Sequence, residues 1–125
     1  MAIPARFRDP FKPGLVLSRG LDRCIWVYTL EGWRRFNSRL EELSPFQEAA
    51  RRVQRAIYAG AFEAELDRQG RVLVPSPLRA YAGITQGVVI LGMNDHLELW
   101  GSELWATEHA TLENETPQIA ERLHG

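Results

Sequence analysis

The chain repeats itself, and this duplication constrains its fold more than any other feature of the sequence. Several segments recur in the same order at an offset of 71 or 72 residues. The matching pairs are residues 3–8 with 74–79, 15–20 with 87–92, 27–28 with 99–100, and Trp33 with Trp105. Ordered self-similarity indicates duplicated supersecondary units, and two copies are too few for a solenoid. We therefore predict a domain with pseudo-twofold symmetry.

The second copy predicts a β-hairpin at its start. Apolar and acidic side chains alternate over residues 62–66, which is the pattern of a half-buried strand. Asp67 and Gly70 suit the first and last positions of a type I turn. Residues 71–74 are mostly apolar again, so we expect residues 62–74 to form two paired strands.

The rest of the second copy predicts a short helix, two strands and a trailing helix. Ser76 is expected to cap the short helix and Gly83 to end it. Strands are expected over residues 88–91 and 96–100, and the trailing helix is expected to start near Ser102.

A helical hairpin is predicted between the two copies. Thr29 is expected to cap a first helix that runs from Leu30. A second helix is expected to start at residues 44–47, which fit a capping box with proline at the first helical position. Gly60 is expected to end this helix. Its predicted apolar face consists of Phe46, Ala49, Ala50, Val53 and Ile57, and its solvated face of Arg51, Arg52 and Arg55.

These elements predict an α+β fold in which two tandem β-rich repeats form a pseudo-twofold β-barrel, joined by the helical hairpin. The predicted boundaries are 1–34 for the first repeat, 35–60 for the helical linker, 61–104 for the second repeat, and 105–125 for a C-terminal helix and tail. We expect the tail after Leu112 to be loosely ordered, with one more helical turn up to Leu123, because polar residues and Pro117 follow Leu112.

Charge is distributed unevenly along the chain, although the net charge is only −1. Residues 1–79 hold 14 Lys and Arg against 9 Asp and Glu, a net of +5, whereas residues 80–125 hold one Arg against 7 acidic residues, a net of −6. Nearly all the cations are arginine, whose planar guanidinium suits phosphates, base edges and carboxylates alike. The charge pattern therefore leaves two interpretations open: nucleic-acid binding, and solvated helix faces that pair with the acidic half.

The sequence lacks the patterns of an enzyme, a metal or cofactor site, or a membrane protein. The histidines have no metal-ligand spacing, the serines stand in no nucleophile elbow, and the glycines form no phosphate loop. The histidines are His96, His109 and His124, which lack this spacing to one another and to Cys24, and the serines are Ser18 and Ser102. No stretch approaches the roughly 18 apolar residues of a membrane span. We expect a cytoplasmic protein without cofactor, in which Cys24 is a buried small hydrophobe.

Two resemblances extend over almost the whole chain, from Met1 to about Thr111. The second copy resembles the AbrB-like motif, an Asp-x-x-x-Arg hairpin followed by a proline-led short helix. The tryptophans, the helical linker and the closing strand are similar to the MraZ family of transcriptional regulators. The residues that carry these likenesses are 67–75, Leu78, Arg79, 20–28, Trp33 and 97–100.

The resemblance implies a function in gene regulation. Members of this family are expected to be repressors that bind double-stranded DNA at repeated operator boxes near a division and cell-wall gene cluster. The resemblance also implies a homo-oligomeric ring, located in the cytoplasm at the nucleoid, in which several weak contacts act together.

Six side chains are the candidate DNA contacts under this resemblance: Asp67, Arg68, Arg71, Arg6, Arg8 and Arg79. Asp67 is expected to hold the turn through backbone N–H groups. Arg71, four residues on, either pairs with Asp67 or reaches DNA. Arg68 is placed at the exposed turn to contact a phosphate. The other three flank the proline-led helices, where the alternative is an ion pair with a neighbouring carboxylate.

The first copy has no counterpart of the predicted hairpin. Ile3 corresponds to Val74, so the equivalents of Arg71 and Asp67 would precede Met1. We expect a misplaced start or a shortened chain, with half of the DNA-binding surface absent. The alternative function is therefore an oligomeric scaffold or interaction module that does not bind DNA.

Overall fold

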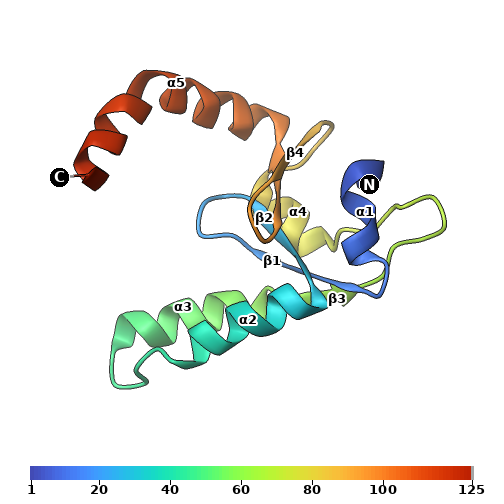
Figure 1. Ribbon diagram of the computed structural model, residues 1–125, viewed down its shortest axis with the longest axis horizontal. Helices are drawn as coiled ribbons and strands as arrows, with labels where there is room; N and C mark the ends of the chain where they lie inside the picture. Colours follow the sequence, from blue (N-terminus) through green and yellow to red (C-terminus); the bar gives the residue numbers. More distant parts are fainter. Residues whose placement is uncertain (125) are drawn as a thin grey trace.

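The computed structural model describes residues 1–124, which form a five-stranded antiparallel sheet with helices around it (Figure 1). The elements in chain order are α1 (Ala5–Arg8), the 3₁₀ helix η1 (Asp9–Phe11), β1 (Leu15–Arg19), β2 (Ile25–Thr29), α2 (Leu30–Glu41), α3 (Glu48–Ala59), β3 (Phe62–Ala64), α4 (Ser76–Ala82), β4 (Val88–Gly92), β5 (Leu97–Gly101) and α5 (Ser102–His124). The α+β class predicted from the sequence is confirmed.

The sheet has the strand order β3-β1-β2-β5-β4, and every neighbouring pair is antiparallel. β1 and β2 are buried on both faces, because helices cover the sides of the sheet that would otherwise meet water. Backbone pairing runs in a line from β3 to β4. Closure of the sheet into the predicted barrel is therefore not confirmed and stays a prediction.

The predicted pseudo-twofold axis passes through the pairing of β2 with β5. Ile25 lies opposite Leu99, Trp26 opposite Glu98, and Val27 opposite Leu97. An offset of 72 residues relates Ile25 to Leu97 and Val27 to Leu99. Exchanging the two copies therefore maps this pairing onto itself, and Trp26 and Glu98 are each other's counterparts at the axis.

The carboxylate of Glu98 links the two central strands at this axis. Trp26 Nε1 donates to Glu98 Oε2 at 3.0 Å, and Trp100 Nε1 donates to Glu98 Oε1 at 3.0 Å. Trp100 is buried, while Trp26 and Glu98 are half-buried. Because buried indole N–H groups need an acceptor, Glu98 satisfies one donor from each strand.

The core lies between the sheet and the two proline-led helices. Pro4 and Pro75 precede α1 and α4 with almost the same backbone angles, φ −53 and ψ 142 against φ −56 and ψ 142. Each helix then delivers apolar side chains to one cluster, whose fully buried members include Ile3, Leu15, Leu17, Ile25, Val27, Leu78 and Leu99. Cys24 is also buried, as predicted, and burial together with the nearby Glu98 and Asp22 carboxylates raises the pKa of its thiol to about 12.

Strand pairing corrects one part of the predicted repeat alignment. Leu15 pairs with Thr29, and Val88 pairs with Gly101, so the counterpart of Leu15 is Val88. The offset between β1 and β4 is therefore 73, not the 72 predicted for residues 15–20. Similarity between two apolar runs does not reveal a slip of one residue, whereas backbone hydrogen bonds fix the register.

The helical hairpin between the copies starts as predicted but turns differently. The hydroxyl of Thr29 accepts from Gly32 N–H at 2.9 Å and caps α2, and α3 ends at Gly60. The prediction that α3 starts at residues 44–47 is wrong, because it starts at Glu48. The Ser44 hydroxyl accepts from the N–H two residues on, at 3.3 Å, and so makes a tight turn instead of a capping box.

The predicted hairpin over residues 62–74 is only partly formed. Its turn closes as predicted, since Asp67 N–H donates to the Arg71 carbonyl at 2.8 Å. Its arms then part, because β3 pairs with β1 whereas residues 70–72 exchange hydrogen bonds of 2.7 and 2.9 Å with residues 1–3. The N-terminal segment, which is the repeat counterpart of residues 72–74, takes the place of the first arm.

Two further expectations about helix ends are corrected. Ser76 is the first residue of α4 and does not cap it; the capping position belongs to Pro75, while Gly83 ends the helix at φ +64 as predicted. The tail after Leu112 is not loose, because α5 continues through Pro117 to His124. Figure 1 shows α5 leaving the body of the protein and bending along its length, and a proline inside a helix commonly causes a bend.

We predict that Glu98→Ala lowers the free energy of unfolding by about 1–3 kcal/mol, because it leaves two largely buried indole donors without their acceptor. The matched control is Glu63→Ala, which removes an exposed glutamate from the edge strand β3 and should change stability by less than about 0.5 kcal/mol. Urea denaturation followed by tryptophan fluorescence measures both. Equal midpoints for the two variants would contradict the role given to Glu98.

Candidate nucleic-acid interface

The turn at residues 67–71 is organised around the carboxylate of Asp67. Its Oδ1 accepts from the N–H groups of Gln69 and Arg71, both at 2.9 Å. Its Oδ2 accepts from Arg71 Nε at 2.9 Å, which forms an ion pair. Gly70 N–H donates to the Asp67 carbonyl at 3.0 Å and closes the type I turn. One carboxylate thus fixes both the backbone of the turn and the guanidinium of Arg71.

These hydrogen bonds lower the pKa of Asp67 below its ordinary value. The largest contribution comes from the backbone N–H of Arg71, and the side chain of Arg71 and the N–H of Gln69 add to it. A lowered pKa in the folded state means that the ionised form stabilises the turn above the ordinary carboxyl pKa. This contribution is lost as the pH falls through the lowered value, so it is fully present at neutral pH.

Arg8 packs directly against this turn from the other copy of the repeat. Gly70 has φ +74, and a Cβ atom on it would lie 2.1 Å from Arg8 Nε. Arg8 Nε donates to the carbonyl of Ile3 at 2.6 Å. Gly70 is therefore required for two reasons, a left-handed backbone conformation and the close approach of the arginine side chain.

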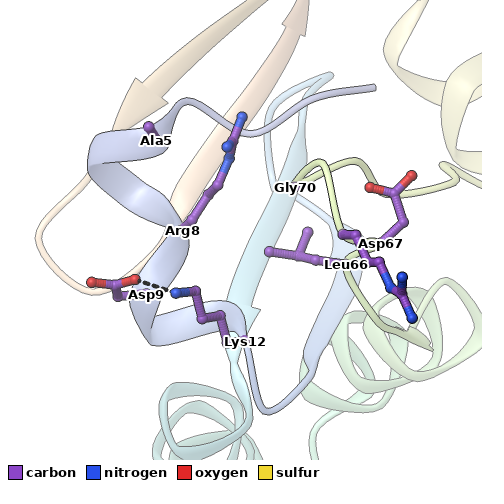
Figure 2. Close-up of a pocket in the computed structure, with 8 residues that line it drawn as sticks. Ala5, Arg8, Asp9, Lys12, Leu66, Asp67 and Gly70 are labelled. Atoms are coloured by element: carbon purple, nitrogen blue, oxygen red, sulfur yellow. Dashed lines mark ion pairs between the residues drawn. The ribbon is translucent and has the colours of Figure 1, made fainter.

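Between the N-terminal helical turns and residues 66–70 lies an open hollow of about 470 Å³, shown in Figure 2. Three cations and two carboxylates line it, namely Arg8, Lys12, Arg68, Asp9 and Asp67, together with Ala5, Leu66 and Gly70. Lys12 and Asp9 form an exposed ion pair of 2.9 Å, and the pKa of Asp9 is lowered by this hydrogen bond and charge. The rim combines exposed cations with a rigid backbone, an arrangement that suits contact with phosphate groups.

The structure brings together four of the six predicted residues, which are Asp67, Arg68, Arg71 and Arg8. The other two lie elsewhere. The guanidinium of Arg6 stacks 4.7 Å from the ring centre of Phe7, beside a second hollow. Arg79 lies on α4 as the repeat counterpart of Arg8, and within residues 1–124 its side chain makes neither a hydrogen bond nor an ion pair.

Lys12 and Asp9 belong to the site but were not predicted. Both come from η1 or the residue after it, more than 50 positions before the turn that they face. No local pattern links these two segments, because their proximity follows from the pairing of residues 1–3 with residues 70–72.

Among the residues that the structure describes, no three His, Cys, Asp or Glu side chains gather closely enough to hold a metal ion. Within the same range, none of the helices has the length and hydrophobicity needed to cross a bilayer.

Each of the two repeats resembles the same family of known proteins. The sequence profile of one family, described as "MraZ protein, putative antitoxin-like", matches residues 1–56 and, separately, residues 57–125. The chain belongs to the MraZ family. The two matched segments divide the chain between the two copies of the repeat, so the MraZ resemblance stated from the tandem motifs is confirmed.

Relatives named "Transcriptional regulator MraZ" match nearly the whole chain. The protein of Thermomicrobium roseum is 42% identical over 123 residues, which cover 98% of this chain and 87% of the relative. That of Herpetosiphon aurantiacus is 40% identical, with 98% and 86% covered. A Thermoanaerobacter relative is 38% identical, with 97% and 85% covered. The matches to the MraZ relatives thus extend over both repeats.

We predict that Gly70→Ala is more destabilising than Gly83→Ala. Both glycines have positive φ, so an alanine is strained by about 1–2 kcal/mol at either position. At Gly83 the added Cβ meets only the flexible Leu104 side chain at 3.1 Å, whereas at Gly70 it displaces Arg8 from its bond to Ile3.

A double-mutant cycle checks the role of Arg8 in this difference. The melting temperatures of both glycine variants are measured in the wild-type and in the Arg8→Ala backgrounds. In the Arg8→Ala background the excess cost of Gly70→Ala should vanish. An excess that persists there would mean that the clash with Arg8 is not its cause.

Proposed function

We propose that this chain is a DNA-binding transcriptional regulator, not an enzyme, and that the turn at residues 67–71 contacts double-stranded DNA. The observation that carries the proposal is the Asp67-centred turn, which holds Arg71 and exposes Arg68 beside the cations Arg8 and Lys12. The printed names of the relatives, which call them transcriptional regulators, support the same conclusion.

The residues have separable roles in this proposal. Arg68, at the exposed second position of the turn, and Lys12 contact phosphate oxygens and supply affinity without sequence preference. Arg71 binds Asp67 through Nε and Gln69 through Nη2, and its remaining guanidinium N–H groups point in a fixed direction toward a base edge. Asp67 and Gly70 position the arginines and touch no DNA themselves. Arg6 and Arg79, which lie away from this turn, extend the proposed contact to the proline-led helices.

We further propose that several copies form a ring that represses a division and cell-wall gene cluster by binding repeated operator boxes, in the cytoplasm at the nucleoid. A single subunit has a net charge of only −1 and few basic residues at the turn, so one subunit alone would bind DNA weakly. A ring that engages several boxes at once gains affinity through effective concentration.

One observation favours the alternative, an oligomeric scaffold that does not bind DNA. Three of the cations at the site already have intramolecular partners: Arg71 pairs with Asp67, Lys12 pairs with Asp9, and Arg8 donates to the Ile3 carbonyl. Salt dependence distinguishes the two functions. Phosphate contacts release counterions, so the affinity of a DNA-binding protein for DNA falls steeply as the salt concentration rises. A scaffold would bind no DNA at either low or moderate salt.

We predict that Arg68→Ala and Arg71→Ala each weaken operator binding about tenfold, the effect of losing a charge-assisted contact of about 1.4 kcal/mol. The matched control is Arg52→Ala, which removes an exposed arginine of α3 that pairs with Glu48, 2.8 Å away. Fluorescence anisotropy titrations across a series of salt concentrations measure affinity and salt slope, after circular dichroism has shown that each variant is folded. A loss for Arg52→Ala as large as that for Arg68→Ala would place the contact surface elsewhere.

We also predict that DNA carrying three spaced boxes binds about 10²–10⁴ times more tightly than DNA carrying one box, because the later contacts are intramolecular. Gel-shift titrations with three-box, one-box and scrambled DNA of equal length measure this. If one box and three boxes bind equally well, the ring does not act on repeats.

A further inference from the structure

The two trailing helices, α2 and α5, are repeat counterparts that differ in their surroundings. In the first copy α3 covers one face of α2. Leu40 on this face is 4% exposed, Gln54 Nε2 of α3 donates to the Leu40 carbonyl at 3.0 Å, and Tyr58 Oη donates to Asn37 Oδ1 at 2.7 Å. The face of α2 that holds Asn37 and Leu40 is therefore packed within the chain.

The equivalent face of α5 is uncovered within residues 1–124. The offset of 72 relates Trp33 to Trp105 and Leu40 to Leu112, and Leu112 is 37% exposed. Figure 1 shows α5 extending away from the sheet with no helix beside it, in contrast to the α2–α3 pair.

The uncovered face is continued by apolar residues in the outer turns of α5. Ile119 follows Leu112 by seven positions and Leu123 follows Ile119 by four, so all three lie on one side of the helix. Leu123 is 84% exposed. An apolar stripe of this length at the end of a projecting helix is typical of a surface that another element covers.

The charges on the helices indicate which element covers the apolar face of α5. α5 carries five glutamates and one arginine, whereas α2 and α3 together carry six arginines and three glutamates. Packing α5 against α5 of another copy would bring two acidic helices together. Packing it against the helical hairpin of another copy would bring opposite charges together.

The helical hairpin also exposes apolar side chains where such a helix would dock. In the turn between α2 and α3, Phe46 is 93% exposed and Leu43 is 38% exposed. Arg51 donates from Nη1 to the Pro45 carbonyl at 2.8 Å and so fastens this turn to α3. Arg52 and Arg55 lie exposed on the same helix.

We propose that α5 of one copy docks, through Leu112, Ile119 and Leu123, on the helical hairpin of a second copy of this chain, around Phe46 and the α3 arginines. The inference rests on the assembly proposed above and names its contact surfaces. The two surfaces are different, so each copy offers one of each. Such head-to-tail contacts close into a ring when the rotation between copies allows it.

The test uses two full-length variants, each with one surface destroyed. Ile119→Asp disables the helix surface, and Phe46→Asp disables the hairpin surface. The matched control is Ala110→Asp, which adds the same charge at an exposed position on the opposite side of α5. Sedimentation velocity gives the mass of each, and circular dichroism melts check that each is folded.

The expected result is an oligomer for the wild type and for Ala110→Asp, and monomers for the other two variants. Mixing Ile119→Asp with Phe46→Asp should give a heterodimer and nothing larger, because the mixture retains one intact pair of surfaces. A monomeric wild type, or unchanged masses for both variants, would overturn the inference. A dimer formed by Phe46→Asp alone would also overturn it, because that result requires α5 to pair with α5.

DNA titrations on the same samples separate this inference from the proposed function. The monomeric variants keep the turn at residues 67–71, so they should bind one box as the wild type does and lose the gain from three boxes. A wild type that assembles through these surfaces but binds no DNA would refute the function and leave the docking intact. If the wild type binds DNA and both variants have the mass of the wild-type oligomer, the docking alone is refuted.

Discussion

The antiparallel pairing of β2 with β5 is the contact on which the rest of the structure depends. It joins the two copies at their symmetry axis, where the Glu98 carboxylate accepts from an indole of each strand. β1 and β4 add outside this pair, and the proline-led helices then close over one core. Neither copy buries its apolar face alone, so the stability of each half depends on this central pairing.

The same symmetry determines the composition of the candidate site. Because residues 1–3 lie beside residues 70–72, the helical turn of the first copy meets the Asp67 turn of the second. Arg8 and Lys12 therefore join Arg68 and Arg71, although more than 50 residues separate the two groups in sequence. Where the symmetry is broken, surfaces are left uncovered: Arg79 is exposed, and α5 has no counterpart of α3 among the described residues.

Sequence patterns failed at particular places for a common reason. Ser44 to Gln47 satisfies the rules of a capping box, yet the same hydroxyl makes a tight turn when two antiparallel helices must be joined. The polar residues and proline after Leu112 predict loose chain, but α5 continues through them. The apolar runs of β1 and β4 align equally well at two offsets. In each case local chemistry permits two conformations of similar energy. Contacts elsewhere select one for the Ser44 turn and for the β1–β4 register, whereas α5 continues as a helix with no other helix beside it.

What the sequence by itself determined is the duplication, the α+β class, and several features made by residues within about four positions of one another. The Thr29 cap, the Gly83 stop and the hold of Asp67 on the backbone of its turn are of this kind. Only the tertiary structure decided that Arg8 packs on Gly70, that Lys12 faces the turn, and that the arms of residues 62–74 part. These contacts join residues far apart in sequence, so no local pattern encodes them, and the pairing of the strands decides which segments become neighbours.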